Sequence, residues 1–229
     1  MQKKRLNLML LLFLGILLLA AEVLSPGFIR PRHLGVVIRQ AAFLGIVGIG
    51  QTLVILTGGI DLSIGALVTA GNIFTCELLG RNPSLSPLLV LIPLLGIGFI
   101  SGTLNGLGIT FLHIPPLIMT VAMGSIIDGV TLIYCGGSAA GYATPPLQYL
   151  GSKLLFNVFP VNSILWIALL GGTAFLLGRT TLGRKVFLVG TNEVAAYVSG
   201  INVKRVKIIT YGLSSFTAIF TGMVLAGYT

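Results

Sequence analysis

The sequence predicts an all-α polytopic integral membrane protein with about seven transmembrane helices, one of them broken. Hydrophobic residues make up 55% of the chain and charged residues only 8%, whereas soluble domains carry roughly 25% charged residues. Apolar stretches recur along the whole sequence, several of them near the 20 residues or so that cross the hydrocarbon core of a bilayer. The basic residues gather in the segments between these stretches, as loops that set membrane orientation do.

The net charge of +9 does not indicate a nucleic-acid-binding protein. No nucleic-acid motif and no alternation of aromatic and basic residues accompanies it, and basic loops account for it in a membrane chain. The sequence also holds no phosphate-binding loop, no His-Glu-x-x-His metal site and no nucleophile–base pair. We therefore predict no catalytic residue, no metal site and no enzymatic activity in this chain.

The first apolar stretch follows the short basic segment Met1–Arg5 and runs from Leu6 to Leu24. A basic start, an apolar run and small residues at Ala20 and Ala21 are also the marks of a signal peptide. The run continues past these alanines and is long enough to span a bilayer. We expect an uncleaved first transmembrane helix, with the signal peptide as the alternative.

The remaining spans follow from apolar runs bounded by Gly, Pro and polar residues. They are expected at Val36–Thr57, then from the break at Thr57–Gly65 to about Leu79, and at Leu88–Phe111, Ile114–Tyr134, Val161–Leu177 and Ile208–Tyr228. Cys135–Pro160 is expected to be a long polar loop. Gly98, Gly102 and Gly106 recur every four residues, which predicts a smooth helix face for close helix packing.

The distribution of basic residues predicts a cytoplasmic N-terminus. If Met1 is inside, the inner segments hold nine basic residues: Lys3, Lys4, Arg5, Arg179, Arg184, Lys185, Lys204, Arg205 and Lys207. The outer segments then hold five: Arg30, Arg32, Arg39, Arg81 and Lys153. This excess on the inside agrees with the positive-inside rule.

The segment TGGIDLSIG, residues 57–65, is expected to break a helix at Gly58 and Gly59. Asp61 or Ser63 can cap the helix that follows, because their side-chain oxygens accept hydrogen bonds from free backbone N–H groups. Inserting a carboxylate at the centre of a membrane helix costs about 2.5–3.5 kcal/mol. The presence of Asp61 in this segment therefore indicates a structural or functional role. Two readings stay open: a structural cap, or a broken helix that lines a translocation path.

Uncharged polar residues inside apolar spans are candidates for the wall of a solute pathway. A polar solute stripped of water needs hydrogen-bond partners, and each one missing costs about 1–3 kcal/mol. The candidates are Gln51, Thr52, Asp61, Ser63, Asn105 and Thr120. The alternative for each of them is an ordinary hydrogen bond between helices, worth about 0.6 kcal/mol.

The segment Arg179–Lys207 is the longest basic interruption between two apolar spans and holds six of the fourteen Lys and Arg residues. Asn192 is expected to cap a short helix, with Glu193 in its first turn where the helix dipole favours a negative charge. Gly200 is expected to end the helix in the left-handed conformation. Ala195 and Ala196 are expected to leave one side of the helix bare for another backbone.

Three segments resemble the permeases of ATP-binding-cassette importers, in the branch for ribose, other monosaccharides and autoinducer-2. They are GTNEVAAYVSGINVKRVK, GGIDLSIG and LNGLGITFLHIPPLIMT. In that family a short coupling helix docks on the ATPase subunit. The resemblance implies this role for Asn192, Glu193, Ala195, Ala196 and Gly200. The broader form of the motif has Glu directly before the two alanines, where this chain has Val194.

The resemblance implies a membrane permease subunit of an importer for a sugar or similar polar solute in the bacterial inner membrane. It implies an ATPase partner that binds ATP, so no cofactor is expected in this chain. It also implies a second permease subunit and a periplasmic or lipid-anchored solute-binding protein. Residues 1–229 are expected to be a single permease domain, short at its C-terminus relative to the family, with the coupling loop at residues 179–207.

Two alternatives to a sugar importer stay open. One is an ion-coupled secondary transporter of a small polar solute, which typically needs an acid or base embedded in the membrane. The other is a permease for branched-chain amino acids, a distant relative of the sugar branch. No residue in the sequence identifies the solute.

Overall fold

The structure is a computed structural model. It describes residues 2–82, 84–138, 141–156 and 158–228, with side chains from residue 8 onward. The side chains of Lys3, Lys4 and Arg5, which enter the predicted orientation, lie outside this part. The elements in chain order are α1 Gln2–Leu24, α2 Pro31–Leu56, α3 Ile64–Arg81, α4 Pro87–Phe111, α5 Pro116–Tyr134, α6 Pro145–Ser152, β1 Leu154–Leu155, β2 Phe159–Pro160, α7 Val161–Arg179, α8 Thr181–Thr191, α9 Glu193–Val198 and α10 Val203–Ala226.

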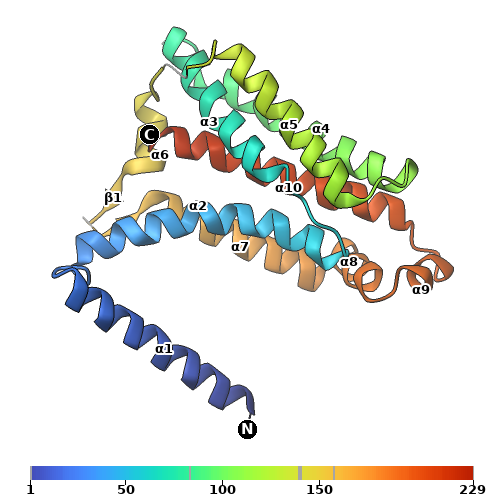
Figure 1. Ribbon diagram of the computed structural model, residues 1–229, viewed down its shortest axis with the longest axis horizontal. Helices are drawn as coiled ribbons and strands as arrows, with labels where there is room; N and C mark the ends of the chain where they lie inside the picture. Colours follow the sequence, from blue (N-terminus) through green and yellow to red (C-terminus); the bar gives the residue numbers. More distant parts are fainter. Residues whose placement is uncertain (1, 83, 139–140, 157, 229) are drawn as a thin grey trace.

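The long helices form a bundle around α10. In Figure 1, α10 runs between a layer made of α2 and α7 and a second layer made of α3, α4 and α5. The short helices α8 and α9 lie at one end of the bundle, and α6 and the strand β1 lie at the other. Of the apolar window of α10, 67% is buried, whereas in α5 and α7 the share is 17%. The larger buried share of α10 agrees with its central position in the bundle.

Proline begins four of the helices, and a glycine with positive φ follows the ends of α2, α5 and α9. Proline occupies the first turn of α2, α4, α5 and α6, where its missing N–H leaves no hydrogen bond unmade. After α2 the chain turns at Gly58, whose φ of +77° few other residues adopt. These residues explain why the apolar stretches form separate helices with short connections.

The glycine face of α4 packs against α10, which confirms the predicted close helix packing. Gly102 lies against the backbone of Tyr211, and a Cβ at this position would lie 2.6 Å from the Ser215 hydroxyl oxygen. A Cβ on Gly106 would lie 2.6 Å from the Cα of Ile208. The two helices therefore approach each other so closely that only glycine fits between them.

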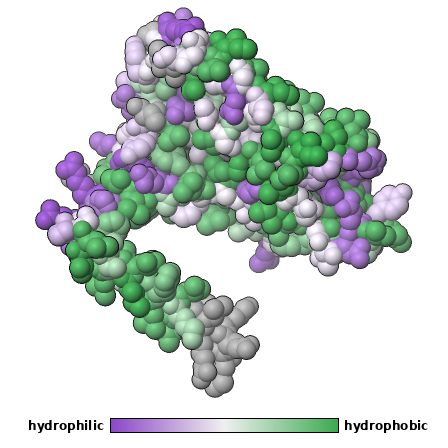
Figure 2. All heavy atoms as spheres, viewed as in Figure 1, coloured by the Kyte–Doolittle hydropathy of each residue, from purple (hydrophilic) through white to green (hydrophobic). Residues whose placement is uncertain are grey.

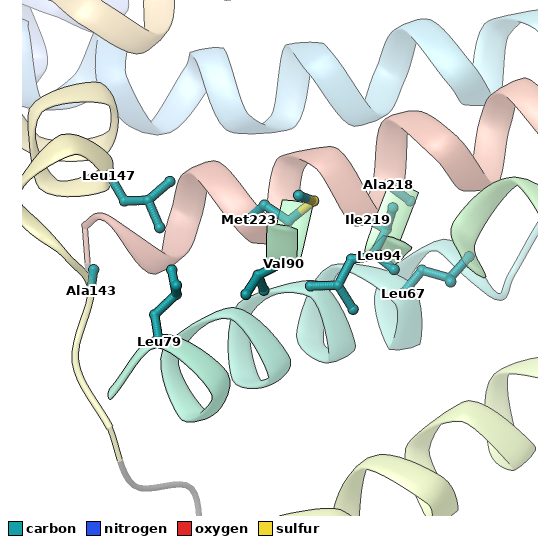
Figure 3. Packing of buried hydrophobic residues seen from close by; sticks show 9 residues of the cluster. All are labelled: Leu67, Leu79, Val90, Leu94, Ala143, Leu147, Ala218, Ile219 and Met223. Atoms are coloured by element: carbon teal, nitrogen blue, oxygen red, sulfur yellow. The ribbon is translucent and has the colours of Figure 1, made fainter. Parts of the chain in front are cut away.

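A second packing region runs along α3, α4 and α10 and extends to α6. Figure 3 shows its nine buried residues, which reach toward one another from four parts of the chain: Leu67, Leu79, Val90, Leu94, Ala143, Leu147, Ala218, Ile219 and Met223. Leu147 comes from α6, so the predicted polar loop at 135–160 contains an amphipathic helix that closes this end of the core. The antiparallel pair of β1 and β2 follows it.

The structure confirms an all-α polytopic membrane protein. Five helices are long and apolar enough to cross a membrane among the described residues: α2, α4, α5, α7 and α10. α1 lies apart from the bundle (Figure 1), and its described apolar part, Leu8–Leu24, is shorter than these five. α3 has 18 residues, among them the ion pair of Glu77 and Arg81 at 2.7 Å. The predicted number of about seven spans thus depends on α1 and α3.

Figure 2 shows hydrophilic residues gathered at both ends of the bundle and a broad apolar band between them. α5 and α7 expose many apolar side chains, among them Ile126, Ile133 and Phe175. An apolar band of this kind, bounded by polar ends, is what a bilayer requires of the protein surface.

Candidate functional site

The short helix α9 lies at one end of the bundle and has the capping residues that the sequence predicts. The side chain of Asn192 accepts a hydrogen bond from the Ala195 N–H at 2.9 Å. Gly200 has a φ of +80°, and its N–H donates to the Tyr197 carbonyl at 2.9 Å. Both ends of α9 are therefore stabilised by local hydrogen bonds, which makes so short a helix a fixed element.

The two alanines, which were expected to leave one side of the helix bare for another backbone, differ in their surroundings, because Ala196 packs inside its own chain. Ala196 is only 4% exposed and packs in a small core of four valines, Val186, Val189, Val203 and Val206. The side chains that pack with this alanine therefore belong to α8 and α10 of the same chain. Ala195 is exposed.

The outward face of α9 is apolar. Val194 is 73% exposed, Tyr197 73% and Val198 80%. Three neighbouring apolar side chains with this exposure, on a short helix whose other side is anchored to the bundle, are typical of a surface that another protein covers. We call Val194, Tyr197 and Val198 the outer face of α9.

Glu193 joins α9 to α10. Its carboxylate accepts a hydrogen bond from the Lys207 ammonium at 2.7 Å. Lys207 lies in the first turns of α10, because this helix begins at Val203 and not at Ile208, where the apolar pattern begins. The basic residues Lys204, Arg205 and Lys207 are therefore helical, and the predicted coupling loop contains two helices, α8 and α9, and the start of a third.

A groove of about 1300 Å³ separates α9 from the connection between α4 and α5. Tyr197, Val198 and Lys204 line one side, and Thr110, His113 and Pro115 line the other. The ammonium of Lys204 lies 4.4 Å from the centre of the Phe111 ring, a cation–π contact between α10 and α4. The groove places the outer face of α9 beside residues of LNGLGITFLHIPPLIMT, the segment that resembled the same family.

The segment between α2 and α3 holds a buried carboxylate. Asp61 is fully buried, and its Oδ1 accepts hydrogen bonds from the Ser63 hydroxyl at 2.6 Å and from the Ser63 N–H at 3.1 Å. Ser214 and Ser215 of α10 lie beside the same carboxylate. Their hydroxyl oxygens and Asp61 Oδ2 are buried and make no hydrogen bond of standard geometry among the described residues.

Asn105 and Thr120 hold this segment against α4 and α5. The Asn105 amide donates to the Ser63 hydroxyl at 3.0 Å, and the Thr120 hydroxyl accepts from the Leu62 N–H at 3.1 Å. Asn105 and Thr120 are both fully buried. The structure therefore brings Asp61, Ser63 and Asn105 into one buried cluster, with Thr120 next to it.

The other two residues expected along a pathway lie away from this cluster. Thr52 is exposed on α2, and its hydroxyl donates to the Gly48 carbonyl of the same helix at 2.6 Å. Gln51 is half-buried, and its side-chain oxygen has no hydrogen-bond partner among the described residues. The six candidates do not line the groove beside α9 or either of two pockets at the α6 end of the described part.

Two groups of residues in the site were not predicted from the sequence. The outer face of α9 carries no polar signal, and only the helical periodicity about the two alanines could have pointed to it. Ser214 and Ser215 form a polar pair inside an apolar span, which is a recognisable signal for a buried contact. In the described part, no three His, Cys, Asp or Glu side chains gather closely enough to hold a metal ion.

Comparison with known proteins places these features in one family. Residues 34–229 match the family model described as branched-chain amino acid transport system / permease component. The chain is 34% identical over 223 residues to the ribose import permease protein of Bacillus subtilis (strain 168), covering 93% of this chain and 66% of that protein. The fructose import permease protein of Rhizobium meliloti is 32% identical, with 95% of this chain and 62% of that protein covered.

A third relative is the autoinducer 2 import system permease protein of Escherichia coli (strain SMS-3-5 / SECEC), which is 30% identical over 88% of this chain and 59% of its own length. The chain thus spans about two thirds or less of the length of these relatives. No solved structure matches. Since the family model covers most of the sequence, from residue 34 to residue 229, this chain belongs to the family of permease components of transport systems.

Proposed function

We propose that this chain is the membrane permease subunit of an ATP-driven importer for a monosaccharide or a similar sugar-like solute. One observation carries the proposal: the outer face of α9, three exposed apolar side chains on a helix capped at both ends. Relatives named for ribose, fructose and autoinducer-2 import support the solute class. ATP would bind to a separate ATPase chain.

The contacts between α9 and the transmembrane helices support coupling between the permease and its ATPase subunit. Glu193 pairs with Lys207 of α10, and Ala196 packs against Val203 and Val206 of the same helix. α10 in turn packs against α2, α3 and α4. A displacement of α9 by an ATPase would therefore act on the most buried helix of the bundle, whose Ser214 and Ser215 lie beside Asp61.

The charges at the two ends of the bundle support an orientation in the membrane. The α8–α9 end holds six described basic residues, Arg179, Arg184, Lys185, Lys204, Arg205 and Lys207, and the opposite end holds five, Arg30, Arg32, Arg39, Arg81 and Lys153. Lys3, Lys4 and Arg5 add to the excess on the inside if the N-terminus is cytoplasmic. We place the α8–α9 end and the N-terminus in the cytoplasm of a bacterial cell, with α1 and α3 as two further spans. A solute-binding protein would then meet the α6 end. A second permease subunit would complete the pathway.

The test is co-purification in detergent of the complete permease with the ATPase expressed from the same source. Val198→Asp places a charge on the outer face of α9 and is expected to abolish capture. Phe156→Asp is the matched control, because Phe156 is an exposed apolar residue (96%) at the opposite end of the bundle. Capture by the Val198→Asp variant at the wild-type level would refute α9 as the docking helix.

Uptake into vesicles identifies the energy source and the solute. We expect uptake of a labelled monosaccharide to require the ATPase and internal ATP. Uptake that persists without the ATPase and collapses with the proton gradient would favour an ion-coupled secondary transporter. Uptake of leucine in place of sugars would favour the branched-chain amino-acid reading.

A further inference from the structure

Three cationic side chains line a pocket at the α6 end of the bundle. The pocket has a volume of about 530 Å³ and lies between the start of α2 and the segment from α6 to β1. Arg32, Arg39 and Lys153 supply the charges, and no Asp or Glu is among the described lining residues. A pocket with three cations and no carboxylate attracts an anion.

The helix α2 places two of these cations on one face. Arg32 and Arg39 are seven residues apart, which is two helical turns. Gly35 lies between them, and the carbonyl of Val158 contacts it so closely that a Cβ would not fit. The Arg39 carbonyl accepts a hydrogen bond from the Asn162 amide at 3.0 Å. The pocket wall is therefore held in place by the strand pair and by the start of α7.

Arg39 is a buried cation without a carboxylate partner among the described residues. Only 8% of it is exposed. Its Nη2 donates to the Ser152 carbonyl at 2.6 Å, and its guanidinium lies 5.2 Å from the centre of the Tyr228 ring. Its Nε is buried and has no acceptor, and neither ion pair of the described part includes Arg39. A buried guanidinium with unused donors is costly unless an anion accompanies it.

We propose that this pocket binds a phosphate group, carried by an anionic lipid headgroup or by free phosphate. The guanidinium of Arg39 keeps one donor, Nε, without an acceptor among the described residues, and guanidinium N–H groups fit phosphate oxygens. Arg32 and Lys153 are exposed at the rim and add two charges. Tyr149 and Gln148 line the same pocket. The Tyr149 hydroxyl can donate, and the Gln148 amide keeps a second N–H beside the one that donates to the Ala143 carbonyl at 3.1 Å.

The position of the pocket suits a lipid headgroup. It lies where α2 begins, at an end of the apolar band, and lipid phosphates lie at that level of a bilayer. Arg39 is eight residues into α2, about 12 Å along the helix axis from Pro31. Its side chain reaches back to Ser152 of α6, as long basic side chains do to keep their charge at the interface. Tyr149, 51% exposed, is of a residue type enriched at interfaces.

The experiment is native mass spectrometry of the complete, purified permease in a neutral detergent, titrated with phosphatidylglycerol, with phosphatidylcholine and with inorganic phosphate. The test variant is Arg32→Gln/Lys153→Gln, which removes two exposed rim charges and leaves the buried Arg39 in place. The matched control is Arg184→Gln/Lys185→Gln, an Arg and a Lys that are equally exposed at the opposite end.

We expect one tightly held phosphatidylglycerol, bound more strongly than phosphatidylcholine, and a loss of affinity of roughly 30-fold in the test variant with none in the control. If inorganic phosphate displaces the lipid, or binds alone with the same dependence on Arg32 and Lys153, the phosphate group itself is the ligand and its source is soluble. Equal lipid and phosphate affinity in the test variant and wild type would overturn the proposal.

Arg39→Gln gives a second, independent readout. It removes the buried cation, and its thermal midpoint shows whether the variant still folds. We expect that added phosphatidylglycerol raises the midpoint of the wild type but not of this variant. A midpoint that rises equally in both would overturn the role of Arg39. An acidic peptide is added to the same titration. If the permease binds this peptide but binds neither phosphatidylglycerol nor inorganic phosphate, the proposal is overturned and the pocket is assigned to a protein partner.

Discussion

Glu193 and Lys207 form an ion pair of 2.7 Å between two helices that are separated by a turn in the chain. The Glu193 side chain is 56% exposed and that of Lys207 is 19% exposed, so water screens the pair and its free energy is small, about 0–1 kcal/mol. Its importance is geometric, because it fixes the start of α9 relative to α10.

The first prediction concerns this ion pair. Glu193→Gln is expected to lower the thermal midpoint in detergent very little, because an exposed pair contributes about 0–1 kcal/mol. The same change should weaken the solute-dependent stimulation of the partner ATPase. The charge-reversed double variant Glu193→Lys/Lys207→Glu should recover most of that stimulation. Stimulation unchanged in the single variant would show that the pair is not part of the coupling.

The second prediction compares two adjacent alanines of α9. Ala196→Leu should destabilise the protein by about 1–3 kcal/mol, because extra methylene groups do not fit among Val186, Val189 and Val203. Ala195→Leu should leave stability almost unchanged, because Ala195 is exposed. Thermal unfolding of both variants in the same detergent measures the difference. Equal midpoints would contradict the packing of Ala196.

The third prediction concerns the contact between α4 and α10. Gly102→Ala should destabilise by about 1–3 kcal/mol, since its Cβ would lie 2.6 Å from the Ser215 oxygen. Gly96→Ala on the same helix has no atom within 4 Å of its Cβ and should be neutral or slightly stabilising, as alanine is the better helix former. The measurement is the thermal midpoint of each variant, and a reversed order would refute the close approach.

The fourth prediction separates the charge of Asp61 from its hydrogen bonds. Asp61→Asn retains an oxygen that can accept from the Ser63 N–H and hydroxyl and should fold. Asp61→Ala leaves these two donors unpaired in a buried site and should cost about 1–3 kcal/mol for each one that finds no other acceptor. The yield of folded, monodisperse protein and its thermal midpoint report the effect. Equal stability of the two variants would mean that Ser63 does not depend on this acceptor.

Local sequence was sufficient to predict several parts of the site. The cap at Asn192, the stop at Gly200 and the break at Gly58 depend only on residues within about four positions, because capping hydrogen bonds and left-handed turns are local. The glycine face of α4 was also predictable, since a repeat of four residues places Gly98, Gly102 and Gly106 on one side. The structure confirms all of these features.

The partners of individual side chains were not predictable. Glu193 pairs with a lysine fourteen residues away, and Ala196 faces its own chain and not a partner. The apolar run predicted the last span from Ile208, but the helix that contains this span begins earlier, at Val203, because basic residues extend it beyond the apolar run. An apolar pattern marks the part of a helix inside a membrane, not the part that projects beyond it.

The sequence by itself determined the class of the protein, the places where its helices begin and break, and the family to which it belongs. Tertiary structure alone decided that α10 lies at the centre, which side of α9 is free, and that Arg32, Arg39 and Lys153 share one pocket. The physical reason is that helices inside a membrane are apolar on most sides. Periodicity then gives little information about which face is buried, and only the packing of distant segments settles it.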